Sequence, residues 1–408
     1  MKKSVLIGPF TQVLPMTNIP LKGALEDHQL EVITNGGILI SEGKITGIGK
    51  FDDLKSNGVE IAHVEGESVC IPGMIDAHTH ICFAGSRAND FALRNSGKSY
   101  LEIAKAGGGI WDTVTKTRKA TSKELVAGII ERAKKHLKSG ITTIEVKSGY
   151  GLTVDEELKM LRAIKEADSK IQPDLIPTCL AAHMKPKDWD GSASAYLEEI
   201  SSKLFPILKS ENLTNRIDAF IEESAFSSLD IAPYFQKARA MGFSITVHAD
   251  QFSVGGSETA IHYNAVSADH LEASSEKEIV LLAKSNTISV ALPGATIGLG
   301  CNFIPARKLL DAGGALAIAS DHNPGSAPMG DLLTQAAILG TFEKLSNAEV
   351  LAGITYRAAA ALELKNKGIL EKGKIADFIT FPTANYKEIT YHQGQLKPNA
   401  VWKNGAKI

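Results

Sequence analysis

The sequence predicts an α/β protein in which a (β/α)8 TIM barrel carries a smaller β-rich region. Apolar segments of strand length alternate with longer amphipathic segments from residue 69 to residue 323, which is the pattern of βα units on a parallel sheet. Eight such strands can be counted, and their span is close to the ~250 residues of a barrel. With 408 residues, the chain is also long for one compact domain.

The first 70 residues have a different pattern. Short strand-like pieces at 3–10, 36–50 and 59–70 are separated by Gly, Asn and Asp turns, which indicates an all-β segment. The apolar patch near the N-terminus is broken by Pro9, Thr11 and Gln12, and no small-residue cleavage site follows it. It is therefore predicted to be a first strand and not a signal peptide.

The barrel strands follow in regular order, with amphipathic helices between several of them. Residues 122–140 and 154–170 carry helical apolar spacing, and the second segment ends before a turn at Gln172 and Pro173. A doubly wound open sheet is the alternative topology, but it does not normally use eight strands in this order. The predicted strands are residues 69–80, 141–148, 175–183, 217–224, 244–250, 265–272, 287–294 and 315–323.

Acids and imidazoles gather at the carboxyl ends of these strands, where barrel enzymes place their chemistry. The first strand ends in IDAHTH, and because alternate side chains of a strand share a face, His78, His80 and Asp76 should point the same way. Buried polar groups without partners are costly, so such a cluster needs an ion or a substrate. The other strand-end groups are Glu145, Lys147, His183, Glu222, Glu223, His248, His270 and Asp321.

A single histidine at a strand end is more often a hydrogen-bonded core residue than a ligand. Five histidines and an aspartate, spread over five strand ends, instead favour a metal site. Imidazole and carboxylate ligands without thiolate suit zinc or iron, and an open coordination position is typical of a catalytic site. The sequence therefore predicts one metal ion, zinc or iron.

Composition argues against several classes of partner. The formal net charge is -2 and no basic stripe with interleaved aromatic residues is present, which disfavours nucleic acid. No apolar run approaches the ~18 residues of a membrane span. The four cysteines are far apart and include no CxxC pair, so a disulfide framework is not expected. We expect a cytoplasmic protein that acts on a small-molecule substrate, and the sequence leaves open whether it forms a homodimer.

The motif PGMIDAHTH, with the histidines of the fifth and sixth strands and the aspartate of the eighth, resembles the amidohydrolase superfamily of metal-dependent hydrolases. The closing stretch GILEKGKIADFITF, residues 368–381, is similar to the superfamily's return into a small β-sandwich built from both chain ends. The resemblance implies a β-sandwich domain of residues 1–70 plus 365–408 and a barrel of residues 71–364 as a continuous insert.

Within the superfamily, five motifs resemble the branch that opens the ring of 4-imidazolone-5-propanoate in histidine degradation: residues 83–94, 100–118, 145–152, 267–272 and 321–328. The forked guanidinium of Arg87 suits an anionic propionate or the ring oxygen. By position, the resemblance implies metal ligation by His78, His80, His248 and Asp321. It implies substrate contacts for Arg87, Tyr150, His183, Gln251, Asn323, Gly325 and Ser326.

The implied reaction is hydrolysis of a ring amide, in which a donor meets the oxyanion that develops at the ring carbonyl. His183 or His270 is expected to be that donor, and His270 and Asp321 are expected to move the proton to the leaving nitrogen. Two positions depart from the family's pattern. Gln251 stands where many relatives carry Glu and cannot take a proton at neutral pH, so the base must lie elsewhere. The segment 291–303 has less aromatic character than expected.

Three further features receive structural interpretations. The GGG run at 107–109 lacks the GK[ST] of a phosphate loop and precedes no clear helix, so a substrate-covering loop is predicted. Lys147 is expected to be structural and not a carbamylated bridge between metals. Only one of Glu222 and Glu223 should face the barrel, because neighbouring strand residues alternate.

Two rival functions stay open. Another cyclic amide or amidine hydrolase, of the hydantoin or deaminase type, would share the metal and the barrel. Deaminases that need a glutamate at the position of Gln251 are disfavoured. The second rival belongs to another class, a metal-bearing scaffold that binds imidazole-like ligands without turnover.

Overall fold

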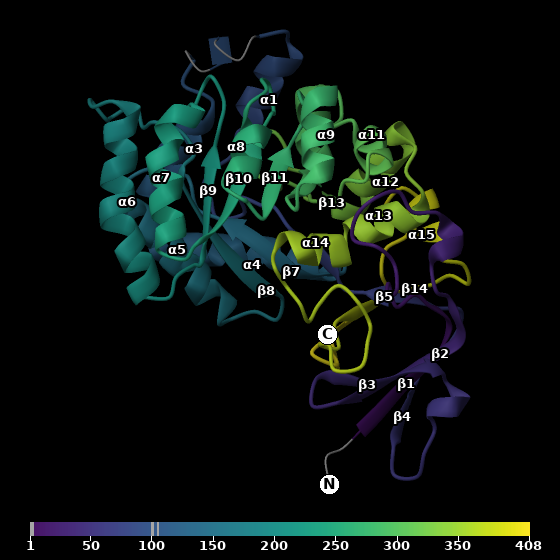
Figure 1. The fold of residues 1–408 in the computed structure, drawn as a ribbon. Coiled ribbons are helices and arrows are strands. Elements are labelled where there is room, and N and C mark those ends of the chain that lie inside the picture. The colour runs from purple at the N-terminus through teal and green to yellow at the C-terminus, as the bar shows by residue number, and fades with distance from the viewer. Residues whose placement is uncertain (1–3, 99–101, 104–105) are drawn as a thin grey trace.

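In a computed structural model that describes residues 4–98, 102–103 and 106–408, a large α/β region lies beside a smaller β-rich region (Figure 1). The motif at 100–118 thus lies partly outside the described residues. The large region contains eight strands in the predicted order, each parallel to its neighbours. They are β6 (Met74–Asp76), β7 (Ile141–Lys147), β8 (Asp174–Ala182), β9 (Arg216–Phe220), β10 (Ser244–Ala249), β11 (Ser267–His270), β12 (Ile288–Ala291) and β13 (Leu316–Ile318).

The barrel closes through the residues that follow its first and last strands. A parallel bridge joins Thr79 to His322. Asp321 N donates to the His78 carbonyl and His80 N donates to the His322 carbonyl, each over 3.0 Å. We call residues 78–80 and 321–322 the seam. Because the seam contains three of the expected ligands, barrel closure and the predicted metal site share the same backbone.

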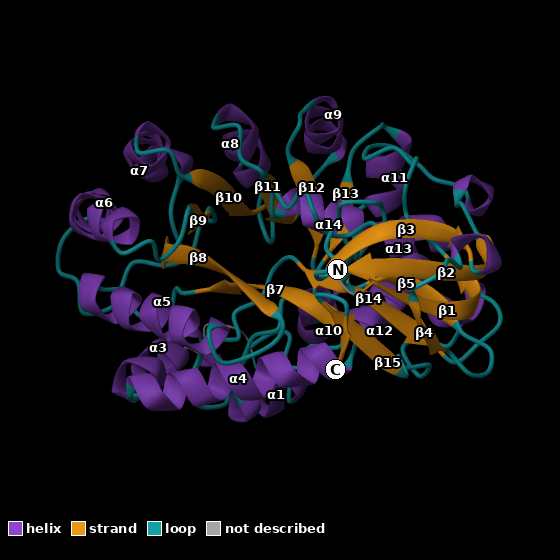
Figure 2. Cartoon of the chain, turned by 90° about the horizontal axis from the view of Figure 1, so that it is seen from below, coloured by secondary structure: helices purple, strands orange, loops and turns teal. Residues whose placement is uncertain are grey.

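Helices cover the outside of the barrel (Figure 2). The helices predicted at 122–140 and 154–170 are α4 (Ser122–Lys138) and α5 (Val154–Asp168). No helix in the described part of the chain is long and apolar enough to cross a membrane. The remaining α-helices of the described residues are α1 (Ala88–Asn95), α3 (Ile110–Lys119), α6 (Ala193–Ser210), α7 (Ser228–Ala240), α8 (Gly256–His262), α9 (Glu276–Lys284), α10 (Pro293–Leu299), α11 (Ala306–Asp311), α12 (Leu332–Glu343), α13 (Asn347–Gly353), α14 (Tyr356–Ala361) and α15 (Lys387–Tyr391).

Strands from the N-terminal end and from the C-terminal end of the chain together build the smaller region, as predicted. One hydrogen-bonded sheet runs through β1, whose residues 5–8 pair with β4 and whose residues 12–13 pair with β5. Phe10, Phe378 and Trp402 pack in its core, the last two stacked with centroids 4.7 Å apart. The strands are β1 (Ser4–Val13), β2 (Ile33–Ser41), β3 (Lys44–Lys50), β4 (Glu60–His63), β5 (Val69–Pro72), β14 (Phe378–Phe381), β15 (Ala400–Lys403) and β16 (Ala406–Lys407).

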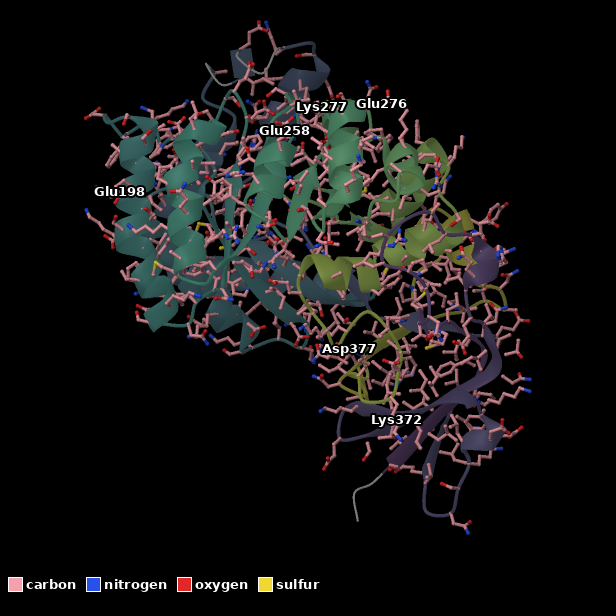
Figure 3. The ribbon with its side chains drawn as sticks, in the orientation of Figure 1. Glu198, Glu258, Glu276, Lys277, Lys372 and Asp377 are labelled. Carbon is pink, nitrogen blue, oxygen red and sulfur yellow. The ribbon has the colours of Figure 1, made fainter. Side chains whose placement is uncertain are left out.

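Two lysines and two aspartates tie the smaller region to the base of the barrel. We call Asp174, Lys367, Asp377 and Lys403 the basal cluster. Lys403 Nζ lies 3.1 Å from Asp174 and 3.2 Å from Asp377, and Lys367 also pairs with both aspartates. Figure 3 shows Asp377 where the two regions meet. The formal charges of the basal cluster therefore balance.

Candidate metal and substrate site

Three histidines meet at the carboxyl ends of the first and fifth barrel strands. His78 and His80 follow β6, and His248 lies in β10. Nε2 of His80 lies 3.2 Å from Nε2 of His78 and 3.3 Å from Nε2 of His248, and all three rings are buried. Oδ1 of Asp321 lies 3.4 Å from Nε2 of His80 and 3.6 Å from Nε2 of His78. The structure thus brings the four predicted ligands together.

The carboxylates behind the histidines show which ring atoms face this group. His78 Nδ1 lies 2.6 Å from Asp269, and His248 Nδ1 lies 3.0 Å from Asp218. Because a carboxylate accepts hydrogen bonds, both Nδ1 atoms carry the proton and both Nε2 atoms present lone pairs. Oδ1 of Asp321 has no hydrogen-bond partner among the described residues. Converging lone pairs and a buried carboxylate oxygen need a cation between them, so this donor set fits a metal ion.

Burial keeps these imidazoles neutral. It lowers the pKa of His248 to about 3 and lowers the pKa of His78 and His80 well below the usual value. Burial also raises the pKa of Asp321 to about 6. Neutral imidazole is the form that binds a metal ion, and a cation among the ligands would favour the ionised form of Asp321.

A buried lysine stands behind the ligands. We call Lys147 and its acids Glu145, Asp218 and Asp269 the inner cluster. Lys147 Nζ lies 2.7 Å from Glu145, 2.8 Å from Asp218 and 3.9 Å from Asp269. Burial alone would lower the pKa of Lys147, but these acids raise it overall, so the side chain is an ammonium ion. This geometry fits the structural role expected for Lys147, because two of its acids also hold ligand histidines.

His183 packs beside the ligands at the end of the third strand. Its ring centroid lies 5.6 Å from that of His80 and 5.5 Å from that of Tyr150. Its Nδ1 donates to the Gly149 carbonyl over 2.9 Å, and burial lowers the pKa of His183 to about 4. The neutral ring therefore presents a lone pair at Nε2. It can accept a hydrogen bond from a substrate N–H group, which argues against His183 as the oxyanion donor.

Glu157 holds the loop that supplies Tyr150, and the sequence did not reveal it. This fully buried carboxylate on α5 accepts from Gly149 N over 3.1 Å and from Gly151 N and Leu152 N over 2.8 Å each. The same bonds fix the Gly149 carbonyl that orients His183. An acid on the apolar face of a predicted helix was the available signal.

Arg87 lies just before α1 and is held by a second residue that sequence reasoning missed. Its Nε donates to Asp90 over 2.8 Å, and Gly109 N donates to the same carboxylate over 2.8 Å. Gly109 is the N-cap of α3, so the expectation that no helix follows the GGG run is wrong. The helix start depends on the φ of +80° at Gly109 and on the distant Asp90, neither of which is a local side-chain cap.

Asn323 folds the loop that follows the eighth strand. Its Oδ1 accepts from Gly325 N over 2.7 Å and from Ser326 N over 2.8 Å, and its Nδ2 donates to the Asp321 carbonyl over 2.7 Å. A Cβ atom at position 325 would lie 2.2 Å from Nη1 of Arg87, so a glycine lets the guanidinium lie against this loop. The structure thereby groups Arg87 with Asn323, Gly325 and Ser326.

The divergent segment 291–303 forms the wall next to this loop. It contains α10, in which a Cβ atom at Gly298 would lie 1.7 Å from the Ser326 carbonyl oxygen. Only glycine, which has no Cβ atom, permits this close approach. Contact with the loop that contains Ser326 thus explains why position 298 of this segment is a glycine.

Gln251 lies on the loop after β10, three residues beyond His248. Glu222 holds this loop, because it accepts from Phe252 N over 2.9 Å and from Ser253 N over 3.1 Å. Glu222 is buried and Glu223 is exposed, which matches the expectation that only one of the pair faces inward.

Asp76 lies apart from the histidines with which it was expected to point. It accepts from Ser320 N over 2.9 Å and from the Ser320 hydroxyl over 2.5 Å, and it lies 3.5 Å from Nδ1 of His136 on α4. The expectation is wrong because β6 ends at Asp76. Beyond that residue the two-residue period of a strand no longer sets the direction of the side chains.

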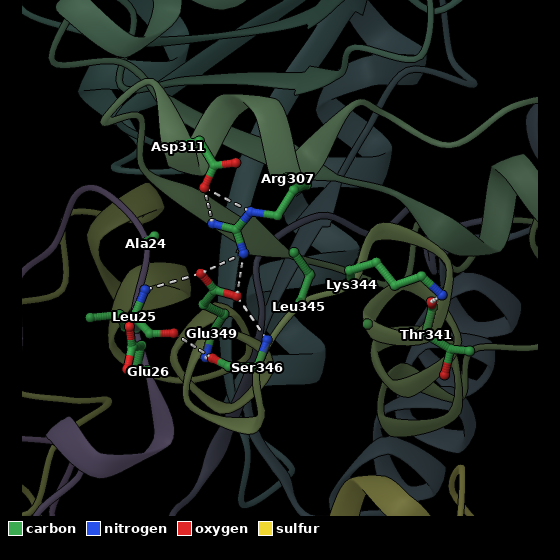
Figure 4. Close-up of a pocket in the computed structure, with 11 residues that line it drawn as sticks. Ala24, Leu25, Glu26, Arg307, Asp311, Thr341, Lys344, Leu345, Ser346 and Glu349 are labelled. Carbon is green, nitrogen blue, oxygen red and sulfur yellow. Dashed lines mark hydrogen bonds and ion pairs between the residues drawn. The ribbon is translucent and has the colours of Figure 1, made fainter.

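A separate cavity of about 660 Å³ lies between residues 24–26 and the helices α11 to α13 (Figure 4). Within it, Glu349 accepts from Leu25 N over 3.0 Å and pairs with Arg307 over 2.9 Å. Arg307 also pairs with Asp311 over 2.8 Å. Arg307 pairs with both carboxylates and Glu349 also binds the backbone of residue 25, so the cavity is a structural junction between the N-terminal segment and the barrel.

Comparison with known proteins places this geometry in a family. Residues 69–408 match the model of the amidohydrolase family. An imidazolonepropionase of Acinetobacter baumannii (strain AB307-0294) is 38% identical over 388 residues, which cover 94% of this chain and 96% of the relative. An imidazolonepropionase of Alkaliphilus oremlandii is 37% identical over 95% of this chain and 93% of its own.

Solved structures of similar fold have lower identity. An adenosine deaminase from Xanthomonas campestris with bound zinc has a TM-score of 0.73 at 18% identity, over 99% of this chain and 92% of that protein. The atrazine chlorohydrolase TrzN from Arthrobacter aurescens, complexed with zinc, has a TM-score of 0.71 at 16% identity, over 99% of this chain and 94% of that protein. At these identities the likeness establishes the fold alone.

Proposed function

The chain belongs to the amidohydrolase family, with imidazolonepropionases as full-length relatives, and from this premise we propose that it opens the ring of 4-imidazolone-5-propanoate. Hydrolysis of the ring amide C–N bond gives N-formimidoyl-L-glutamate, a step of histidine degradation. One observation supports this most directly. The convergence of His78, His80, His248 and Asp321 provides a metal site for hydrolysis at the end of the barrel.

We propose that these four residues hold one metal ion, zinc or iron, since imidazole and carboxylate accept either. When bound, such an ion lowers the pKa of water and draws electron density from a carbonyl oxygen. Asp218 and Asp269 would hold the rings of His248 and His78 in the ligating orientation. Quantifying zinc and iron in the purified protein decides between the metals.

We propose that Arg87 binds the substrate's propionate or the ring oxygen, with Asp90 fixing the guanidinium through Nε. Asn323, Gly325 and Ser326 form the adjoining wall, and Ser326 can supply a further donor. Tyr150 and His183 would contact the ring, His183 through the lone pair at Nε2.

The proton steps need a base other than Gln251. We propose that His270, with Asp321, takes a proton from the attacking water while the water oxygen bonds to the ring carbonyl carbon. The C–N bond then breaks, and the proton passes to the departing ring nitrogen. The amide of Gln251 orients the substrate. Atoms balance, because one water molecule is consumed and its hydrogens end on the new carboxyl group and the freed nitrogen.

The direct test incubates the purified, metal-quantified protein with fresh 4-imidazolone-5-propanoate and follows the loss of ring absorbance and the appearance of formimidoylglutamate. We expect turnover that a chelator removes and added metal restores. Metal-loaded protein without ring opening would contradict the proposal. The same sample would then be assayed with hydantoins and cyclic amidines, with ammonia release as the mark of a deaminase.

We also propose that the enzyme works in the cytoplasm on this small-molecule substrate, and a homodimer is the assembly to test. Light scattering after gel filtration measures the mass of the assembly, for which a monomer corresponds to 43.6 kDa. A mass at the monomer value over the working concentration range would exclude the dimer.

A further inference from the structure

The end of β11 has a strained backbone. His270 has a φ of +84° and the next residue, Leu271, a φ of +72°. Neither is a glycine, and residues with a side chain rarely adopt this conformation. Leu271 N donates to the Ala249 carbonyl over 3.0 Å, and Ala273 N donates to the Asp250 carbonyl over 2.7 Å. These bonds to the neighbouring strand hold the turn in place.

This turn brings Glu272 back toward His270. Oε2 of Glu272 lies 3.5 Å from Nδ1 of His270, and both side chains are almost fully buried. Oε1 of Glu272 accepts from the Thr296 hydroxyl on α10 over 3.0 Å. Among the described residues, neither His270 Nδ1 nor Glu272 Oε2 has a hydrogen-bond partner. Two buried polar atoms without a hydrogen bond therefore lie within ion-pair distance of each other.

His270 stands next to the ligand group. Its ring centroid lies 5.4 Å from that of His248 and 5.8 Å from that of His78. With a carboxylate facing Nδ1, the proton of the neutral ring resides on that atom and Nε2 is left as an acceptor. Gln251 cannot accept a proton, and Asp321, which shares the proton step in the proposed function, is also a predicted metal ligand. A histidine with a fixed tautomer is the acceptor that this arrangement provides.

We propose that Glu272 is a positioning residue for ring opening: its carboxylate holds the proton of His270 on Nδ1, so that Nε2 takes the proton of the attacking water. The inference rests on the proposed function. The proton of water passes to Nε2, the water oxygen bonds to the ring carbonyl carbon, and the same proton later passes to the leaving nitrogen. Glu272 itself exchanges no proton with substrate and acts through His270.

The test compares Glu272→Gln with Glu276→Gln, a matched substitution of an exposed glutamate at the start of α9 (Figure 3). The glutamine at 272 keeps the shape and an acceptor for Thr296 but loses the charge. We expect kcat to fall about 10–100-fold, the range for partners that orient site residues, with KM and bound metal unchanged. Glu276→Gln should match the parent enzyme in all three.

A double-mutant cycle separates positioning from a structural role. In a His270→Asn background, Glu272→Gln should cause no further loss of kcat, because the residue acts only through the imidazole. An equal loss in both backgrounds would overturn the inference, as would an unchanged kcat in the single variant. If the parent enzyme opens no ring, the proposed function fails first, and this outcome is distinct from the other two.

A readout that needs no turnover is the tautomer itself. In protein with ¹⁵N-labelled histidine, the ring signals of His270, assigned by their loss in His270→Asn, should report a proton on Nδ1. In Glu272→Gln they should shift toward the Nε2-protonated form, and unchanged signals would count against the proposal.

If Glu272→Gln does not fold, Thr296→Val replaces it in both experiments, because it removes the hydroxyl that anchors the carboxylate. A smaller loss of kcat in the same direction is then expected.

Discussion

The inner and basal clusters are both buried groups of lysines and carboxylates, but their charges are arranged differently. In the basal cluster, Lys367 and Lys403 each face both aspartates, so positive and negative charges are equal. In the inner cluster, Lys147 alone faces three carboxylates within 3.9 Å. The basal cluster is balanced in formal charge, whereas the inner cluster has an excess of carboxylates, and burial raises the pKa of Glu145 and raises that of Asp269 to about 7.

This difference separates a structural cluster from a functional one. Buried charges persist only when they are paired or hold a metal. Two acids of the inner cluster, Asp218 and Asp269, face Nδ1 of the ligand histidines His248 and His78, whose Nε2 atoms lie with that of His80. The excess of carboxylates over lysines thus marks the barrel end that binds a cation.

The largest effect is expected from breaking the ligand group. His248→Ala removes one of three imidazoles, so the metal should be lost. Ring opening should then fall by three or more powers of ten, since metal catalysis contributes several kcal/mol and each 1.36 kcal/mol is tenfold. Metal analysis and steady-state assays measure both effects. His262→Ala, at an exposed histidine on α8, is the control. Full activity in His248→Ala would remove this residue from the ligand set.

The next effect is on stability. Lys147→Met leaves Glu145, Asp218 and Asp269 without their ammonium partner, and breaking such a buried pair costs about 3–5 kcal/mol. Urea unfolding should show this loss, and added metal should restore part of it by binding the native state. Lys203→Met, which removes only an exposed pair with Glu199, should cost at most about 1 kcal/mol. Equal losses in the two variants would contradict the role given to Lys147.

A smaller loss is expected at the base of the barrel. Lys403→Met leaves Lys367 facing both aspartates, so we expect about 1–3 kcal/mol from the group left poorly paired. Metal content and kcat should stay at parent values, because no ligand is held from this cluster. A loss of metal in Lys403→Met would show that the two clusters are not independent.

The smallest effect is expected at the position that departs from many relatives. Gln251→Glu places a carboxylate on the loop held by Glu222, at a cost within about 0.5 kcal/mol for a substitution at a partly exposed site. If the base lies elsewhere, the variant should gain none of the roughly 10²–10⁴-fold that general base catalysis provides. A gain of that size would assign the missing base to position 251.

The sequence predicted the features that depend on short-range pattern. The eight strands and the ligands at their ends follow from apolar periodicity and from the place of polar residues after each apolar run. The predicted direction of Asp76 was wrong, because side chains alternate with a period of two only while the strand continues, and β6 ends at Asp76.

The missed residues depend on contacts between distant segments. Asp90 meets Gly109 across 19 positions, and Asp269 meets His78 across 191. Nothing local distinguishes Asp218 or Asp269 from other polar residues inside a strand. Glu157 was hidden in a helix whose apolar spacing accounted for the fold without it. Partners of this kind become visible only when the strands are placed around the barrel.

The seam has a further consequence for how the barrel opens. Strand pairing there consists of one bridge, and its amides belong to His80 and Asp321. An ion held by His78, His80 and Asp321 would cross-link the first strand to the last, as a disulfide joins two loops. Hydrogen exchange at these two amides would then slow when the ion binds, before any substrate is present. The exchange rates of these two backbone amides would then show whether the metal ion is bound.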